Sequence, residues 1–339
     1  MSPLPIPAPV REMEGPVSAE ILADIRERRQ PVVMRGLVAD WPAVAAARQG
    51  DEALCAAIAQ GGSTRPVQAI AAKPEEGGRF FYTPGLTDLN FIRGKGRLET
   101  FLGDLLRLAG RDAVPAMAVQ SEDIGEVIPA FAHANTLGLL PGVRPRIWIG
   151  NRIRVAPHFD VKENIACCIG GRRIFTIFPP DQTANLYPGP FELTPAGTPI
   201  SLVDLSAPDL DAFPRFADAQ AAAQEATLAP GDAIYIPYCW WHGVASLDDM
   251  NVLVNYWWND GEPKGIGGGY EAMLHALYAY RHLPPEQRDV WRDLLDYYVF
   301  ERSGDPAAHL PDDAKGVLGP PSPGLFARMR GTIRDALAR

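Results

Sequence analysis

The apolar positions of this chain divide it into three regions of different texture. Between about residues 146 and 261, short apolar segments alternate with Gly, Pro and Asp turns, as in IWIG, RRIFTIF, ISLVDL and NVLVNYWW. Short strands at this spacing, with turn residues between them, are typical of a β-sandwich or barrel. We therefore predict a mainly β core over 146–261, with flanking helices on both sides.

The flanking regions show helical spacing, and residues 1–145 are expected to form both helices and strands that pack on the β core. In residues 1–145, Ser18 is placed to cap a helix that runs to about Arg29, and the apolar positions of 98–108 fall on one helical face. A proline-rich arm over residues 1–17 precedes them. In residues 262–339, apolar stripes predict three further helices, at 270–281, 285–301 and 324–338. The chain is thus divided at 145 and 261, with a C-terminal helical region.

Composition and charge exclude several classes of protein. Apolar residues make up 47% of the 339 residues, which is globular, and a net charge of -9 disfavours nucleic acid as a partner. The densest basic stretch, residues 93–97, is short and is interpreted as a solvated loop. No apolar run is long enough for a membrane span. The four cysteines form no CxxC pair, which fits a reducing, cytoplasmic location.

Two histidines lie in strand-like segments beside turns. In the segment His158-Phe159-Asp160, the imidazole and the carboxylate share one face because alternate strand residues point the same way. His242 follows the aromatic segment 233–241 and is the natural third ligand. An HxD pair is common by chance, and a lone strand histidine is usually a core residue. The downstream segment that ends in His242 is what favours a metal here.

The type of ligand indicates which metal is expected. Two histidines and one carboxylate on one side of an octahedral ion leave three positions open, as non-haem iron(II) oxygenases require. Zinc instead prefers a closed tetrahedral site or a single open position. We therefore interpret His158, Asp160 and His242 as an iron(II) triad.

The same region resembles a known family. The matching residues are ordered and correctly spaced: His158-Phe159-Asp160, Asn164, Phe178-Pro179-Pro180-Asp181-Gln182, Leu186-Tyr187-Pro188, Gly231-Asp232, Ile236-Pro237, Trp240-Trp241-His242 and Val254-Asn255-Tyr256-Trp257. The opening segment 31–42 also fits. Together they resemble the cupin-like JmjC oxygenases, and bacterial relatives of the asparaginyl hydroxylase that inhibits hypoxia-inducible factor are the nearest in appearance.

The resemblance implies a double-stranded β-helix, iron(II), 2-oxoglutarate as cosubstrate and hydroxylation of a protein side chain or a small molecule. It places Asn164 and Asn255 in the cosubstrate pocket, and it puts Arg173 where the family has a lysine that pairs with the far carboxylate of 2-oxoglutarate. An arginine can make that pair with two hydrogen bonds. Along a flat hairpin Arg173 would lie too far from the metal, so its role requires consecutive strands to pass between two sheets.

Two positions depart from the family. A threonine and a tyrosine that bond the cosubstrate there fall on Val155 and Ala118 here, so two hydrogen bonds are lost. Tyr82 or Tyr235 are candidates to replace them. These departures keep open a metal-dependent cupin that chelates its substrate directly, without 2-oxoglutarate.

A non-catalytic cupin-like binding module is a further alternative, which an intact triad disfavours because a structural metal site tends to be closed by a fourth ligand. The resemblance also implies a homodimer formed through the C-terminal helices. Their amphipathic pattern alone would equally fit packing within one chain.

Overall fold

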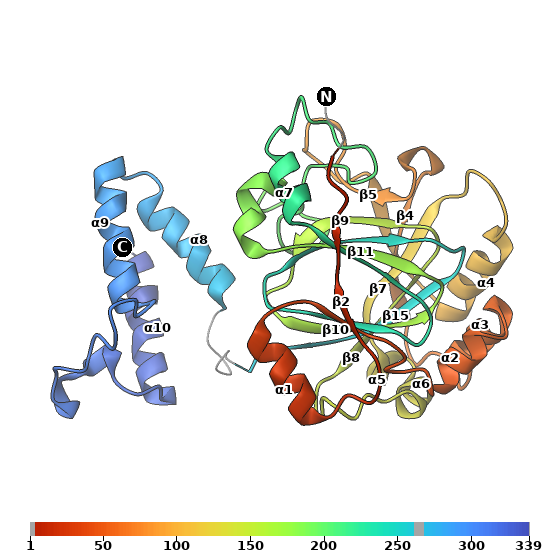
Figure 1. The fold of residues 1–339 in the computed structure, drawn as a ribbon, viewed down its shortest axis with the longest axis horizontal. Helices are drawn as coiled ribbons and strands as arrows, with labels where there is room; N and C mark the ends of the chain where they lie inside the picture. Colours follow the sequence, from red (N-terminus) through yellow and green to blue (C-terminus); the bar gives the residue numbers. More distant parts are fainter. Residues whose placement is uncertain (1–3, 261–267, 339) are drawn as a thin grey trace. The chain divides into compact units, whose positions relative to one another are not determined.

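The computed structural model describes residues 4–260 and 268–338, and the chain forms two compact units, Met1–Asn259 and Asp260–Arg339 (Figure 1). The predicted boundary at 261/262 falls at the start of residues outside this description. Each unit is treated separately below.

The first unit is built on two mixed β-sheets. Their inner faces pack together, since buried residues of both sheets share one apolar cluster that includes Phe175, Ile177, Ala166 and Ile234. The six-stranded sheet has the order β1 (Ala8–Pro9), β12 (Gln224–Leu228), β11 (Arg173–Phe178), β14 (Trp241–Ser246), β9 (Arg154–Phe159), β5 (Arg79–Phe80). The nine-stranded sheet has the order β2 (Arg11–Met13), β3 (Val32–Met34), β13 (Ala233–Ile236), β10 (Glu163–Gly170), β15 (Asn251–Trp258), β8 (Pro145–Gly150), β7 (Ala116–Asp123), β4 (Val67–Ala72), β6 (Phe91–Gly96).

This architecture confirms the predicted mainly β jelly roll with flanking helices. From β8 to β11 successive strands alternate between the sheets, because β8 and β10 belong to the nine-stranded sheet and β9 and β11 to the six-stranded one. The passage occurs at Gly170-Gly171. Gly171 has φ +68°, and a Cβ there would collide with the carbonyl oxygen of Met250. Only glycine suits a position that combines a positive φ with no room for a Cβ atom.

Helices cover the outer face of the nine-stranded sheet. Buried side chains of α1 and α4 share one core with sheet residues such as Ile165 and Val254. Both helices were predicted: the Ser18 hydroxyl accepts a hydrogen bond from the Ile21 amide, and α4 ends at Leu108. The α-helices of this unit are α1 (Ala19–Arg28), α2 (Pro42–Ala47), α3 (Asp51–Ala59), α4 (Leu98–Leu108), α5 (Ile124–Val127), α6 (Pro129–Ala134) and α7 (Phe216–Ala222). Short 3₁₀ turns span Pro74–Glu76 and Pro180–Leu186.

Two local predictions were wrong. The segment ISLVDL at 200–205 forms only one isolated bridge, Ser201 with Pro188. Its apolar residues are buried by side-chain packing, with Ile200 beside Tyr82 and Ala156 and with Val203 in the cluster of Phe178 and Trp241, so their burial needs no continuous strand pairing. The basic stretch predicted as a loop lies largely in β6. The proline-rich arm, for which no strand was specified, contains β1 and β2.

The second unit is helical, as predicted. Its α-helices are α8 (Gly269–Tyr280), α9 (Pro285–Tyr298) and α10 (Pro323–Leu337), with 3₁₀ turns at Asp312–Ala314 and Gly316–Leu318. Across the described residues of the whole chain, no helix combines the length and apolarity that a bilayer crossing needs.

Candidate metal centre

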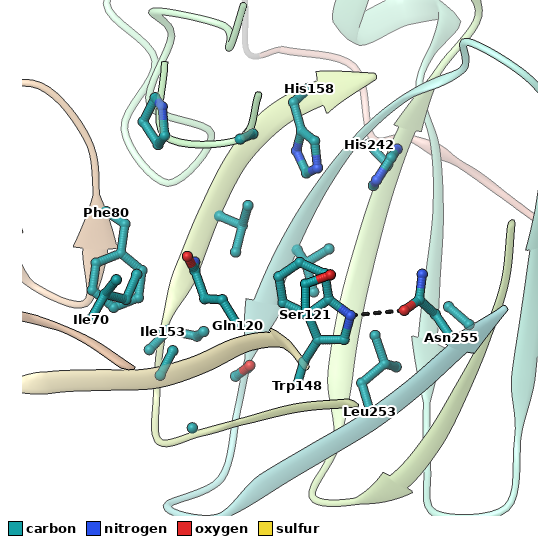
Figure 2. Close-up of a pocket in the computed structure, with 18 of the residues that line it drawn as sticks. Ile70, Phe80, Gln120, Ser121, Trp148, Ile153, His158, His242, Leu253 and Asn255 are labelled. Atoms are coloured by element: carbon teal, nitrogen blue, oxygen red, sulfur yellow. Dashed lines mark hydrogen bonds between the residues drawn. The ribbon is translucent and has the colours of Figure 1, made fainter. Parts of the chain in front are cut away.

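Strand register brings the three predicted metal ligands together. In the antiparallel pair of β9 and β14, His158 lies directly opposite His242, and their ring centroids are 4.4 Å apart. Asp160 follows two residues after His158, just beyond the end of β9. One ligand atom from each of the three lies within 4.8 Å of the others. Both histidines project into the same cavity (Figure 2).

The backbone orients both imidazole rings. Nδ1 of His158 lies 3.1 Å from the carbonyl oxygen of Ala156, and Nδ1 of His242 lies 3.1 Å from that of Trp240. An imidazole whose Nδ1–H donates to a carbonyl presents the lone pair of Nε2, which is the form that binds a metal. Each histidine is therefore held as a ligand by a contact two residues back on its own chain.

The electrostatics of the triad also fit a cation. Burial, with a contribution from His158, lowers the pKa of His242 to about 4, so this ring is neutral at physiological pH. Oδ2 of Asp160 is buried 3.5 Å from Nε2 of His242 and accepts no hydrogen bond from the described residues. A buried carboxylate oxygen without a donor is costly. A divalent ion bound by the three residues would remove that cost.

The triad opens onto a cavity between the two sheets. Its volume is about 370 Å³, in the range of small-ligand sites. In Figure 2 it extends from the histidines past Gln120 to Ile70 and Phe80. Residues of both sheets line it, and most are apolar, so the few polar groups define what binds there.

Apart from the triad, Arg173 is the most deeply buried charged residue that lines this cavity. It is 4% exposed, and its Nε has no hydrogen-bond partner among the described residues. Burial lowers the pKa of Arg173 to about 10, so the guanidinium is still protonated at neutral pH. Ser246 lies directly opposite in the pairing of β11 with β14, and its buried Oγ also has no partner there. The protonated guanidinium of Arg173 and the hydroxyl of Ser246 are thus adjacent donors whose hydrogen bonds are unsatisfied among the described residues. This arrangement suits a carboxylate ligand.

Ser246 was not predicted from the sequence. A signal was present, because Ser246 follows His242 by four residues on one strand, and even spacings share a face. What the sequence lacked was the pairing that puts Ser246 opposite Arg173.

The two asparagines lie side by side on neighbouring strands at the cavity wall. Nδ2 of Asn255 donates to Oδ1 of Asn164 at 3.3 Å. Nε1 of Trp148 donates to Oδ1 of Asn255 at 2.8 Å, the bond drawn as a dashed line in Figure 2. Both asparagines line the cavity. Trp148 fixes the orientation of the pair.

The two departures from the family are in the cavity wall. Val155 and Ala118 both line it with apolar side chains. The tyrosines considered as replacements are engaged elsewhere: the hydroxyl of Tyr82 donates to the Leu193 carbonyl at 2.9 Å, and that of Tyr235 donates to Glu163 at 2.7 Å. Neither tyrosine lines the cavity. The donors that face its interior are therefore different ones, of which Ser246 is the clearest.

The fold and the ligands together define a class: a jelly-roll protein with a two-histidine, one-carboxylate triad, suited to a metal ion, that opens onto a largely apolar cavity. Residues 18–263 match the family described as "Cupin-like domain", which is well over half of the chain. The chain therefore belongs to the cupin-like JmjC family, as its motifs indicated.

Several curated proteins are similar over part of the chain. The lysine-specific demethylase JMJ31 of Arabidopsis thaliana is 34% identical over 131 residues, 38% of this chain and 22% of that protein. HSPB1-associated protein 1 of Homo sapiens is 37% identical over 120 residues, 34% of this chain and 24% of that protein. Lysine-specific demethylase 8 of Danio rerio is 27% identical over 241 residues, 70% of this chain and 55% of that protein. The matches thus span about a quarter to a half of each relative.

Proposed function

We propose that this protein is an iron(II)- and 2-oxoglutarate-dependent dioxygenase that hydroxylates a protein side chain or a small molecule. The observation that carries the proposal is the pairing, in one cavity, of the triad with the unsatisfied donors of Arg173 and Ser246. A keto acid with a second carboxylate has a group for each of these two sites.

Each residue has a defined task in this proposal. His158, Asp160 and His242 would hold iron(II), which supplies O2 activation coupled to oxidative decarboxylation of 2-oxoglutarate to succinate and CO2. Arg173 and Ser246 bind the far carboxylate and so fix the cosubstrate in one orientation. The apolar wall of the cavity excludes water from the reacting atoms. The relatives named as demethylases support an oxidative reaction at a C–H bond.

The first test is an anaerobic titration of the metal-free protein with iron(II) and then 2-oxoglutarate. A visible charge-transfer band that forms in the wild type and is lost in His158→Ala is expected. If iron binds and no band forms, the 2-oxoglutarate assignment is wrong. Oxygen-dependent release of succinate then tests turnover.

A second candidate is a metal-dependent cupin oxygenase that chelates its substrate directly. The apolar side chains of Val155 and Ala118 in the cavity wall favour it. It predicts that Arg173→Met leaves activity unchanged. A non-catalytic binding module predicts purified protein with no bound iron and no succinate release.

We also propose that the chain acts as a homodimer through its C-terminal unit. Helices α9 and α10 expose a set of large apolar side chains: Val290, Trp291, Leu294, Tyr298, Met329, Ile333 and Leu337. Exposed apolar patches of this kind mark interaction surfaces. Light scattering of the wild type should give a molar mass of twice the chain mass. The double variant Leu294→Glu with Tyr298→Glu should give the mass of a single chain. A single-chain mass for the wild type at micromolar concentration would contradict the proposal.

A further inference from the structure

The strand β6 is the open edge of the nine-stranded sheet. In the described part of the chain it pairs with β4 alone, and its residues after Phe91 are all exposed. An edge strand presents unpaired amide and carbonyl groups that another extended chain can bind. The sequence of this edge, with Arg93, Lys95 and Arg97 alternating with two glycines, gives it a strong positive charge.

The register of the sheet connects this edge to the catalytic cavity. Gly150 of β8 pairs with Ala118 of β7, Ala118 pairs with Ile70 of β4, and Ile70 pairs with Arg93 of β6. All four residues line the cavity, so one row of side chains leads from its interior to the open edge. Figure 2 shows Ile70 on the side of the cavity away from His242. The cavity mouth and the β6 edge are therefore continuous.

The cations of the edge face this row. Gln68 pairs with Lys95, and Gln68 also lines the cavity, so Lys95 shares the face of Arg93. Neither Arg93 nor Lys95 makes an ion pair with any described residue. The nearby acids are already engaged, since Glu122 pairs with Arg65 and Asp104 with Arg107. The local charge at the mouth is positive although the chain as a whole is acidic, and salt screens the distant acids within about 10 Å.

The opposite face of β6 is apolar. Ile92 is 75% exposed and borders a hollow whose lining is mostly apolar and includes Ala69, Phe101 and Met117; Arg93, Lys95 and Asp104 also border this hollow. A strand added to β6 would therefore meet cations on one face and an apolar hollow on the other. Because strand side chains alternate between faces, such a strand needs carboxylates at every second position and apolar residues between them.

We propose that β6 docks an extended, acidic segment of a protein substrate by main-chain pairing, with successive carboxylates opposite Arg93 and Lys95. A second copy of this edge does not fit, because the cations of the two copies would lie opposite one another and repel. The row from Gly150 to Arg93 crosses three strand spacings, about 14 Å. The residue that reacts therefore lies roughly four or more residues along the chain from the docked acidic segment.

That the docked segment is a substrate rests on the proposed function, but its binding does not. The test measures binding by fluorescence anisotropy on the full chain, using a labelled decapeptide in which aspartate alternates with valine. A matched peptide has lysine in place of aspartate. We expect the aspartate peptide to bind at least tenfold more tightly, with an affinity that falls as salt rises.

Two sets of variants examine the surface itself. Arg93→Glu with Lys95→Glu should weaken the aspartate peptide at least tenfold and strengthen the lysine peptide. The control, Arg288→Glu with Arg328→Glu, makes the same charge change on exposed residues of the C-terminal unit and should leave both affinities unchanged. Equal affinity for the two peptides, or equal weakening by the control, overturns the proposal.

Main-chain pairing has its own probe. Methylating the backbone nitrogens of alternate residues removes donors on one edge of the peptide at a time. One of the two methylation registers should abolish binding and the other should retain it. If both methylated peptides bind as well as the parent, pairing at β6 is wrong. If the wild type binds the peptide but forms no charge-transfer band with iron(II) and 2-oxoglutarate, the proposed function is wrong and the docking proposal stands.

Discussion

The two ends of the cavity are built in opposite ways. At the deep end, His242, Arg173 and Ser246 are buried on strands β11 and β14, which have hydrogen-bonded neighbours on both sides. At the outer end, Arg93 and Lys95 are exposed on a strand with one free edge. The deep end is suited to a fixed geometry, which an oxidative reaction needs. The outer end is suited to reversible contact with a partner, so chemistry and partner choice are separated between strands of the two different sheets that line one cavity.

The largest effect is expected from the metal ligands. His158→Ala removes one of three ligands, and we expect iron(II) affinity to fall by at least about 100-fold, because loss of an outer-sphere partner alone costs 10–100-fold. Metal content after dialysis and the anaerobic band measure it. His133→Ala, at an exposed position of α6, is the control. Full iron retention in His158→Ala would mean that the triad is not the metal site.

Removing the buried cation should come next. Arg173→Met leaves the far carboxylate of 2-oxoglutarate unpaired, and we expect about 100-fold weaker binding, since loss of a buried charged partner costs about 3 kcal/mol. Arg173→Lys should restore part of it, because one ammonium replaces a two-pronged donor. Titration of the band with 2-oxoglutarate gives both affinities.

Arg172→Met provides the matched control for this position. Arg172 is exposed and paired with Asp248, one residue away from Arg173. Equal weakening by both variants would point to a general charge effect and not to a pocket residue.

Ser246→Ala should have a smaller effect at the same place. It removes one neutral donor to a carboxylate, worth about 1.5 kcal/mol, so the 2-oxoglutarate affinity should fall about tenfold. Iron affinity should not change, which distinguishes loss of a ligand contact from loss of the fold. An unchanged 2-oxoglutarate affinity would remove Ser246 from the cosubstrate site.

The smallest effect sharpens the comparison between the two ends. Arg93→Glu with Lys95→Glu should change iron and 2-oxoglutarate affinity by less than about twofold, because exposed charges beyond a Debye length are screened. The same titrations measure it. A tenfold change would show that the outer end is electrostatically coupled to the metal site.

Local patterns predicted much of this molecule. The period of two along 158–160 put His158 and Asp160 on one face, and the helical stripe of 98–108 gave α4 with its bounds. What they could not give was pairing between distant strands. The position of Ser246 opposite Arg173 depends on β11 lying beside β14, which no local pattern contains.

The errors have the same cause. Glycines and cations have low strand propensity, and 93–97 is largely a strand because β4 pairs with it. Conversely, 200–205 has the apolar texture of a strand, but its side chains are buried without a continuous strand partner, and it makes only one isolated bridge, Ser201 with Pro188. Apolar pattern reports burial, and burial and pairing coincide only inside a sheet.

The amino-terminal strands have a practical consequence for how this protein is produced. β1 pairs with β12 of one sheet and β2 pairs with β3 of the other, and Val10 between them is buried. Residues 8–13 thus form the edge strand of both sheets, covering β12 in one and β3 in the other. A truncated chain that starts at Ser18, where the family match begins, would lack both edge strands. It would expose two bare edges and is expected to aggregate during purification even with its metal site intact.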